Sequence, residues 1–343
     1  MGRFDSEGGE FVGHAVDFVE TGASFLTMNT NSKIYVAGHH GMVGSAVVRA
    51  LRANGFSNLI ARSSRELDLT RQEQVEAFFA AEKPDYVFLA AARVGGILAN
   101  KTYRADFIYI NLQIECNVIH AAWKAGVKKL LFFASSCMYP RLCPQPMREE
   151  MLWSGLLEPT NSPYAAAKLA GIALCQAYRD QHGADFFSVI PTNLYGPNDN
   201  YDPEQSHVMA ALLLKCHQAK LAHAPTVTLW GTGTPRRELM YVDDAAAASL
   251  FLMQQENLAG PINIGVGTDR SILELAQVVK ATVGYAGDIV FDATKPDGAP
   301  RKLIEVSRLT ELGWRASTTL EEGVALAYRD FLETGGHRPT ARG

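Results

Sequence analysis

The stretch Lys33-Ile-Tyr-Val-Ala37, followed directly by Gly38-His-His-Gly-Met-Val-Gly44, decides the fold of this 343-residue chain. Its first five residues form a short apolar, β-rich run that predicts a buried strand. Three glycines at a G-x-x-G-x-x-G spacing then permit a tight turn, and Met42–Ala53 has the pattern of an amphipathic helix. Strand, glycine turn and helix in this order predict a dinucleotide-binding unit, in which backbone amides at the helix N-terminus approach a pyrophosphate.

Outward from this unit, apolar strands continue to alternate with longer helical stretches. The alternation predicts a Rossmann-type α/β fold with a doubly wound parallel sheet and right-handed crossovers. The further predicted strands are Asn58–Ala61, Tyr86–Ala90, Lys129–Ala134 and Phe186–Pro191. The further predicted helices are Gln72–Glu82, Arg104–Ala125 and Tyr164–His182.

The domain organisation follows from the same pattern. Residues 1–30 are rich in glycine, lack the basic-then-apolar order of a signal peptide, and are expected to form a flexible extension, with Met28 as an alternative start. Residues 31–197 are expected to form the Rossmann domain, to which later segments return. Residues 198–335 are expected to form mainly a smaller α/β substrate lobe, and residues 336–343 a tail.

Composition excludes several classes of protein. A net charge of −4, with 47% hydrophobic and 20% charged residues, gives no indication of a nucleic-acid or membrane partner. No apolar run is long enough to span a bilayer. The five cysteines are scattered and include no C-x-x-C, which argues against a disulfide framework or a zinc site and fits a reducing cytoplasm. His39 and His40 are interpreted as loop residues, and no metal is predicted.

The end of the second predicted strand indicates which dinucleotide binds. NAD sites usually place an acid there, near the ribose 2′-hydroxyl. Here Arg62-Ser-Ser-Arg65 follows the strand, and the first acid is Glu66. Guanidinium and hydroxyl groups suit a 2′-phosphate, so NADP(H) is favoured, although two arginines on a solvated loop remain the alternative.

A second motif is Tyr164-Ala-Ala-Ala-Lys168, which follows the predicted strand end Ser135-Ser-Cys-Met-Tyr139. Positions i and i+4 of a helix share one face, so the phenol and the ammonium are expected to point into one cleft. A nearby ammonium favours the phenolate, and we therefore expect Lys168 to lower the pKa of Tyr164 toward neutrality. Taken alone, such a pair is also compatible with a solvated lysine beside a half-buried tyrosine.

Together these motifs resemble the extended short-chain dehydrogenase/reductase family, from about Lys33 to about Glu333. The motifs that carry the resemblance are Gly38–Gly44, Ala90–Ile97 (A-A-A-R-V-G-G-I), Ser135–Pro140 (S-S-C-M-Y-P), Glu158–Lys168 (E-P-T-N-S-P-Y-A-A-A-K), Pro191–Pro197 (P-T-N-L-Y-G-P), Ser206–Val208 (S-H-V), Trp230–Glu238 (W-G-T-G-T-P-R-R-E) and Lys295–Gly298 (K-P-D-G). Within the family, the chain most strongly resembles the members that epimerise GDP-4-keto-6-deoxy-D-mannose at C3 and C5 and then reduce C4 with NADPH. It also implies a homodimer formed through the two long helices, Arg104–Ala125 and Tyr164–His182.

The resemblance implies roles for five catalytic residues. Cys137 would be the base of the epimerisations and His207 the acid that reprotonates. Ser135, Tyr164 and Lys168 would hold the C4 oxygen and stabilise its developing charge, and Tyr164 would protonate it after hydride transfer. A buried cysteine or a lone histidine is more often structural, and Cys116, Cys175, Cys216, His120, His217 and His223 are interpreted in that way.

Further residues are expected to bind the cofactor or the substrate. The cofactor residues implied are Gly38, Gly41, Met42, Val43, Gly44, Arg62, Asp68, Leu69, Ala90, Lys168, Pro191, Asn193, Leu194 and His207. The substrate residues implied are Ser136, Asn193, Lys215, Trp230, Arg237 and Asp297. His40 and Lys215 stand where some relatives carry arginine, and this departure affects affinity rather than activity.

Alternatives remain for three of the substrate residues and for the activity. Trp230 would stack on guanine or pack in a core, Arg237 would pair with the diphosphate or with Glu238, and Asp297 would contact the nucleotide sugar or cap its turn. Another nucleotide-sugar epimerase or reductase of the same fold is the nearest rival function. A 4,6-dehydratase would need an acid–base carboxylate pair where Cys137 and Met138 stand. A non-catalytic NADP-binding regulator is the rival of a different class.

Overall fold

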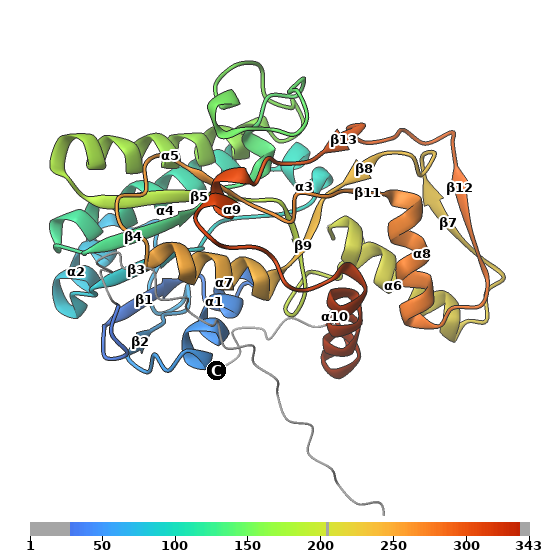
Figure 1. Ribbon diagram of the computed structural model, residues 1–343, viewed down its shortest axis with the longest axis horizontal. Helices are drawn as coiled ribbons and strands as arrows, with labels where there is room; N and C mark the ends of the chain where they lie inside the picture. The colour runs from blue at the N-terminus through green and yellow to red at the C-terminus, as the bar shows by residue number, and fades with distance from the viewer. Residues whose placement is uncertain (1–27, 204–205, 337–343) are drawn as a thin grey trace, which may run out of the picture.

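The computed structural model describes residues 28–203 and 206–336 (Figure 1). Most of the predicted N-terminal extension and nearly all of the predicted tail lie outside these residues, so the structure does not describe them. Among the described helices, none combines the length and the apolar character that crossing a membrane requires.

The centre of the protein is a six-stranded sheet in the order β10-β5-β4-β3-β1-β2, and every neighbouring pair is parallel. Parallel neighbours need crossover connections, which the helices between successive strands supply. The strands are β1 (Ile34–Ala37), β2 (Leu59–Ile60), β3 (Tyr86–Leu89), β4 (Lys129–Phe133), β5 (Asp185–Pro191) and β10 (Ile262–Ile264). The predicted doubly wound Rossmann-type sheet is confirmed.

Both faces of this sheet are buried, as strands without polar alternation require. Val36 and Phe88 pack into the core on the side of α1 (Met42–Ala53) and α7 (Val242–Met253). Tyr35 and Leu89 pack into the core on the opposite side, which a second set of helices covers. Those helices are α2 (Gln72–Glu82), α4 (Arg104–Lys124) and α5 (Ser162–His182).

The predicted bounds of the helices and strands are confirmed to within about two residues. Helix α5 begins at Ser162 rather than at Tyr164, because Pro163 lies in its first turn, where the missing N–H of proline costs no helical hydrogen bond. Strand β2 is shorter than predicted and consists of two residues, Leu59 and Ile60, at the edge of the sheet.

The remainder forms a lobe beside the sheet with its own apolar core (Figure 1, right). Its helices are α6 (Val208–Leu221), α8 (Ile272–Val283) and α10 (Leu320–Thr334). Its strands are short and form small sheets: β7 (Thr226–Trp230) with β12 (Asp288–Asp292), and β8 (Arg236–Arg237) with β11 (Arg270–Ser271) and β13 (Arg301–Lys302).

The chain crosses between the two parts several times. Strand β6 (Asn193–Tyr195), which follows β5, pairs with β9 (Leu239–Tyr241), which leads into α7. Strand β10 completes the central sheet, and α9 (Ser307–Glu311) packs beside it. The short elements between these are α3 (Ile97–Thr102), η1 (Ser136–Met138) and η2 (Glu149–Met151). The elements drawn from residues after 197 therefore include part of the Rossmann half as well as the lobe.

Candidate active site

The glycine turn after β1 lies where the strand order of the sheet reverses, between β1 and β3. Gly38 has a positive φ of 86°, and a Cβ there would lie 2.7 Å from the backbone nitrogen of Ala91. A Cβ on Gly44 would clash with the carbonyl of Gly38. Glycine is therefore required at both positions, because the turn passes close to the end of β3 and α1 packs tightly onto β1.

This turn leaves the N-terminus of α1 without a side-chain cap. Gly41 is the N-cap residue, and Met42 and Val43 form the first turn of the helix. The uncapped N–H groups can donate hydrogen bonds to a pyrophosphate, and the positive end of the helix dipole favours its negative charge. These residues therefore fit a dinucleotide. Ala90, which follows β3, donates its N–H to Ala37 at 3.0 Å and borders the same crevice.

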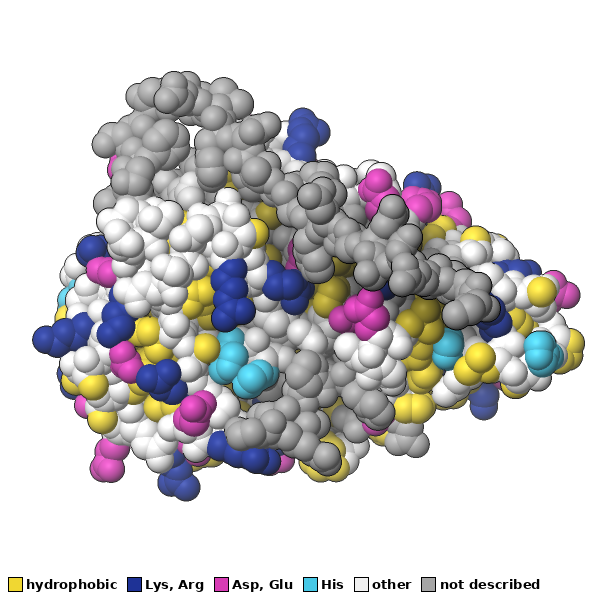
Figure 2. Space-filling model, turned by 90° about the horizontal axis from the view of Figure 1, so that it is seen from below, with side chains coloured by type: hydrophobic (Ala, Val, Ile, Leu, Met, Phe, Trp, Pro, Cys, Tyr) yellow, Lys and Arg dark blue, Asp and Glu magenta, His cyan; other side chains and the backbone are white. Residues whose placement is uncertain are grey.

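Two histidines stand in the turn itself. The rings of His39 and His40 lie 3.9 Å apart between centroids. Burial lowers the pKa of His39, His40 lowers it further, and Glu66 opposes them. In Figure 2, which views the molecule from below, histidine and basic side chains lie next to one another on the Rossmann half.

The predicted 2′-phosphate corner after β2 already contains an ion pair. Arg62 donates to the Glu82 carboxylate at 2.7 Å and to the Ala61 carbonyl at 2.9 Å, whereas Arg65 is exposed. Asp68 accepts two hydrogen bonds from Thr70, at 3.0 and 2.7 Å, which lower the pKa of its carboxyl. Asp68 thus stabilises its own turn, next to the partly buried Leu69.

Four of the five predicted catalytic residues lie close together, where β4 ends and α5 begins. Ser135 is the N-cap residue of η1, and its Oγ accepts a hydrogen bond from the Cys137 amide at 3.4 Å. The same hydroxyl hydrogen-bonds to Tyr164, and this contact opposes the other effects on the pKa of Tyr164. Lys168 lies one turn farther along α5 and donates to the Phe133 carbonyl at 3.0 Å. The end of β4 and the start of α5 therefore present a hydroxyl, a thiol, a phenol and an ammonium together.

The expectation that Lys168 lowers the pKa of Tyr164 is wrong for this structure. Burial raises the pKa of Tyr164 well above its ordinary value, and Cys137 and Glu115 raise it further. The Lys168 ammonium is paired elsewhere, 3.2 Å from Glu115 Oε1. Its charge is already compensated, so Tyr164 is a phenol in this state, a proton donor rather than an acceptor.

Glu115 was not identified from the sequence. Its side chain is 1% exposed, and that of Lys168 is 3% exposed. Asn111, Glu115, Val118 and Ala122 lie on one buried stripe of α4. A carboxylate within an otherwise buried helical stripe was the signal available in the sequence.

Cys137 is a thiol in this environment. Burial raises its pKa, while the Ser135 hydrogen bond, Lys302 and Lys168 act in the opposite direction. Ser136, beside it, is buried. Two cations therefore favour the Cys137 thiolate, although burial outweighs them in the free protein.

Lys302 was also missed, since nothing in the spacing Arg301-Lys302 marks it as a site residue. Strands β8 and β13 are parallel and in register, with Arg301 beside Arg236 and Lys302 beside Arg237. Because successive side chains of a strand point to opposite faces, Arg237 and Lys302 share one face and Arg236 and Arg301 the other.

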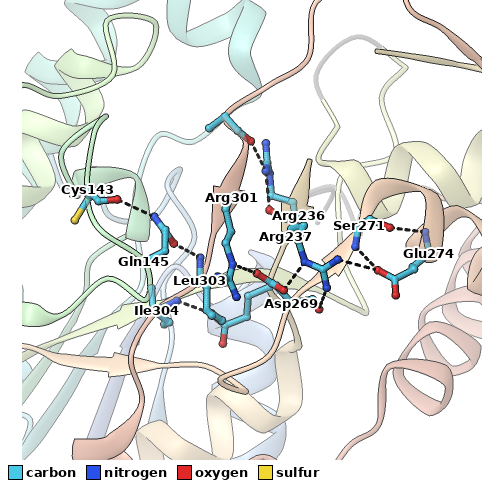
Figure 3. Close-up of polar contacts among 12 residues, drawn as sticks. Cys143, Gln145, Arg236, Arg237, Asp269, Ser271, Glu274, Arg301, Leu303 and Ile304 are labelled. Carbon is cyan, nitrogen blue, oxygen red and sulfur yellow. Dashed lines mark hydrogen bonds and ion pairs between the residues drawn. The ribbon is translucent and has the colours of Figure 1, made fainter. Parts of the chain in front are cut away.

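The two faces differ in their counter-ions (Figure 3). Arg236 donates to Asp269 at 2.8 Å, and Arg301 pairs with the same carboxylate. On the other face, the Lys302 ammonium makes no hydrogen bond or ion pair with any described residue. Burial lowers the pKa of Lys302 against the raising effect of Cys137, and Arg237 lowers it further. Two like charges on neighbouring strands thus lack a shared carboxylate.

Arg237 does not pair with Glu238, which removes one of the two sequence interpretations. Glu238 is fully buried, and its carboxylate accepts backbone N–H groups of Val266, Gly267 and Ile304 at 2.7–2.9 Å. Arg237 instead donates to the Ala299 carbonyl at 2.6 Å and to its neighbour's carbonyl at 2.8 Å. Glu238 fixes the strand that carries Arg237, and the guanidinium keeps donors available.

The other predicted substrate residues lie at the lobe. The Trp230 side chain ends β7 and is 69% exposed, with the Lys295 ammonium 5.9 Å from its ring centroid, so it is not a core residue. Asp297 accepts from the amide and the hydroxyl of Thr232 at 2.9 and 2.8 Å, which stabilises the glycine turn after Trp230. Lys215 is exposed on α6.

Three further predicted residues line the junction between β5 and β6. Pro191 is the last residue of β5, and Asn193 opens β6. The Asn193 amide donates to the Glu238 carbonyl at 3.0 Å, and Leu194 is buried. This junction therefore links the cofactor side of the site to the strand of Arg237.

The predicted acid, His207, is the N-cap residue of α6. Its side chain is exposed, and its ring makes no hydrogen bond to a described residue. The structure thus groups Ser135, Cys137, Tyr164 and Lys168 directly. Within the part of the chain that the structure describes, His207 makes no hydrogen bond or ion pair with any of these four residues.

Comparison with known proteins matches this architecture to one family. The model of the NAD dependent epimerase/dehydratase family matches residues 34–265. The chain belongs to this family. The resemblance inferred from the motifs is confirmed. The cofactor of this family is a nicotinamide dinucleotide, and the glycine turn after β1 fits it.

Several characterised relatives cover nearly all of this family member. It is 54% identical over 313 residues to GDP-L-fucose synthase 1 of Arabidopsis thaliana, covering 91% of this chain and 97% of the relative. A GDP-L-fucose synthetase from Naegleria fowleri bound to NADP superposes with a TM-score of 0.84 at 29% identity, covering 93% and 98%. A GDP-mannoheptose C4 reductase from Campylobacter jejuni with NADP bound gives 0.83 at 41% identity, covering 89% and 100%.

Proposed function

We propose that this protein epimerises GDP-4-keto-6-deoxy-D-mannose at C3 and C5 and then reduces C4 with NADPH, giving GDP-L-fucose. The observation that carries the proposal is the position of Cys137, which shares the hydroxyl of Ser135 with Tyr164. An epimerase needs a base beside the group that holds the C4 oxygen, and a plain reductase does not. The relatives named GDP-L-fucose synthase support the same activity.

The epimerisations use the acidity that the C4 ketone gives to the C3 and C5 protons. Cys137, as thiolate, removes a proton, and the negative charge moves to the C4 oxygen. Tyr164 and Ser135 donate hydrogen bonds to that oxygen and stabilise the enolate. His207 returns a proton on the opposite face, which inverts the carbon. For His207 to act, its exposed ring has to turn into the cleft when substrate binds.

Reduction follows at the same C4 carbonyl group. When bound, NADPH supplies the hydride that adds to C4. Tyr164 then donates its phenolic proton to the C4 oxygen, and Lys168 holds the nicotinamide ribose. The protonated state of Tyr164 in the free protein suits this direction of the reaction, because the phenol is the form that donates.

We assign NADP(H) rather than NAD(H) on the basis of the corner after β2. Arg62 and Arg65 supply guanidinium groups for a 2′-phosphate. The phosphate has to compete for Arg62 with Glu82, which Lys33 also contacts at 2.8 Å. Glu82 can keep its ion pair with Lys33 when the Arg62 side chain turns to the cofactor. The NADP-bound relatives support this assignment.

The diphosphate of the substrate is assigned to Arg237 and Lys302. Their two charges lie on neighbouring strands, and neither side chain forms an ion pair with a carboxylate of the described residues. A diphosphate would relieve this repulsion through charge-assisted hydrogen bonds. Trp230, exposed at the end of β7, offers its ring to the guanine base.

We further propose that the protein is a cytoplasmic homodimer that pairs through α4 and α5. These helices lie side by side on the outer face of the sheet (Figure 1). Tyr109 is 64% exposed on α4, and a shallow apolar depression lined by Ile108, Pro163 and Ala166 lies between the helices. The five cysteines are free thiols, which supports a reducing compartment.

The direct test incubates the protein with NADPH and GDP-4-keto-6-deoxy-D-mannose and follows absorbance at the nicotinamide band. We expect oxidation of NADPH and deuterium at C3 and C5 of the product when the reaction runs in deuterated water. Absence of NADPH oxidation would contradict the reductase activity. The Cys137→Ser variant should still reduce a substrate that is already epimerised, and should introduce no deuterium.

A second candidate is C4 reduction of another GDP-sugar without epimerisation. The similarity to the GDP-mannoheptose C4 reductase favours it as the alternative. The same deuterium measurement separates the two, because a plain reductase leaves the C3 and C5 protons in place.

A further inference from the structure

The catalytic lysine of this site has a counter-ion that the reaction scheme above does not use. Lys168 Nζ lies 3.2 Å from Glu115 Oε1 and 3.0 Å from the Phe133 carbonyl oxygen. The ammonium also lies 4.5 Å from the centroid of the Phe132 ring. Anion, carbonyl and aromatic face thus surround a cation that water hardly reaches, since both charged side chains are almost completely buried.

The backbone is shaped to allow this pair. Gly171, one turn beyond Lys168 on α5, faces both Phe132 and Glu115. A Cβ on Gly171 would lie 2.5 Å from the Phe132 ring and 3.0 Å from Glu115 Oε2. The two long helices approach closely at this point, so the carboxylate of α4 reaches the lysine of α5 beneath the active site.

Among the described residues, few other ionisable groups interact with Glu115. From α5, Glu115 faces Lys168, Tyr164 and Cys175, and from its own helix it faces Cys116.

From the neighbouring elements that the structure describes, one further ionisable group faces this pair, and it is not a carboxylate. Cys137 of η1 faces Tyr164 and Lys168. The charged side chains that lie along α4 from α2 and from the loop after β3 are paired elsewhere: Glu76 with Lys124 at 3.3 Å and Arg93 with Asp106 at 3.5 Å.

We propose that Glu115 is a positioning residue that neutralises the buried Lys168 ammonium and thereby keeps Tyr164 in its protonated, hydrogen-donating form. A lysine with no counter-ion would favour the phenolate, as an enzyme that oxidises an alcohol needs. Paired with Glu115, Lys168 can hold the ribose while exerting little net charge on the phenol. This places the proton on Tyr164 before the substrate arrives, ready for the C4 oxygen.

The effect of Glu115 on Tyr164 has the sign that this role requires. Burial, Cys137 and Glu115 together raise the pKa of Tyr164. Burial raises the pKa of Glu115 itself to about 6, against the lowering effect of Lys168. The carboxylate is therefore ionised at neutral pH, where the pair acts on Tyr164.

The first experiment titrates Tyr164 in the free protein and needs no substrate. The phenolate absorbance of the wild-type protein is recorded against pH, and that of Tyr164→Phe is subtracted, so that the other tyrosines cancel. We expect no phenolate from Tyr164 near neutral pH. A Tyr164 signal that appears near neutral pH would overturn the proposal, even if no Glu115 variant folds.

The second experiment repeats this titration in Glu115→Gln and Glu115→Asp, each against the same variant with Tyr164→Phe. Glutamine keeps the size and removes the charge, so Tyr164 should titrate at least about one pH unit lower, a tenfold change in its ionisation constant. Aspartate keeps the charge and should restore most of the wild-type titration. Glu76→Gln, which removes a carboxylate of α2 that pairs with Lys124 of α4, is the matched control and should change nothing.

Kinetics then connect this inference to the proposed function, on which its catalytic meaning rests. With NADPH and the ketosugar, the loss of kcat at high pH should begin about one pH unit lower in Glu115→Gln, with KM for the ketosugar little changed. A uniform loss of kcat at every pH, with an unmoved Tyr164 titration, would mean that Glu115 is merely structural. If Tyr164 titrates as expected but wild-type protein does not oxidise NADPH, the proposed function fails and the role of Glu115 stands.

Discussion

Two cations, one from the Rossmann half and one from the lobe, act on the pKa of Cys137, and the protein balances their charges differently. Lys168, in the Rossmann half, has a buried carboxylate 3.2 Å away. Lys302, in the lobe, makes no ion pair within the described residues and feels the Glu158 carboxylate only as its weakest electrostatic influence, and Arg237 lies beside it on the next strand. In the half to which we assign the chemistry, the protein itself neutralises the cation. In the half to which we assign substrate binding, the positive charge is left for an anion to neutralise, and the difference predicts which changes alter kcat and which alter KM.

The largest effect is expected from removing the proton donor of the Rossmann half. Tyr164→Phe should lower kcat by about 10²- to 10⁴-fold, the usual contribution of a general acid, and should change KM for the ketosugar little. Steady-state NADPH oxidation measures both constants. A large rise in KM with unchanged kcat would remove the distinction between the two halves.

Removing Lys302, the lobe cation that forms no ion pair within the described residues, should act mainly on binding. A hydrogen bond to a charged group contributes about 1.5–3 kcal/mol, so Lys302→Met should raise KM by roughly 10- to 100-fold. Arg301→Met, one residue away on the face that Asp269 neutralises, is the matched control. Equal effects of the two variants on KM would show that the free charge of Lys302 is not what binds the substrate.

The buried pair of Glu115 and Lys168 should make the free energy of unfolding depend on pH. The folded-state pKa of Glu115, about 6, lies above its ordinary value of 4.5, so the folded protein holds this proton more tightly than the unfolded chain. The resulting stabilisation is complete below pH 4.5 and is lost as the pH rises through 6, an amount of about 2 kcal/mol. Urea unfolding at both ends of this range should show the loss in wild-type protein and not in Glu115→Gln. Parallel pH dependences would contradict it.

The smallest effect is expected at the rim of the lobe. Trp230 is mostly exposed, so Trp230→Ala should leave the melting temperature unchanged. Loss of stacking on guanine, about 0.5–1.5 kcal/mol, should raise KM roughly 2- to 10-fold. A competition assay with GDP measures the same loss without turnover. Unchanged GDP affinity would place the guanine elsewhere on the lobe.

Most of the Rossmann half was predictable, because local sequence carries the signals that form it. Gly38 and Gly44 mark a turn that only glycine fits, and helix α1 was predicted with the boundaries that it has. Ser135, Cys137 and Tyr164 were expected together because the carboxyl end of a parallel strand meets the following helix there. The lobe was predicted only as a unit, since two-residue strands such as β8 and β13 have no period to detect.

The sequence by itself determined the fold, the glycine cradle and which groups we propose to move protons. Only the tertiary structure decided the charge state of those groups. Glu115 stands 53 positions before Lys168 along the chain, and Lys302 stands 65 positions after Arg237; each pair meets only when the sheet and the lobe have folded. A local pattern shows which side chains can ionise, but burial and a distant counter-ion fix whether they do, because both depend on neighbours far away in sequence.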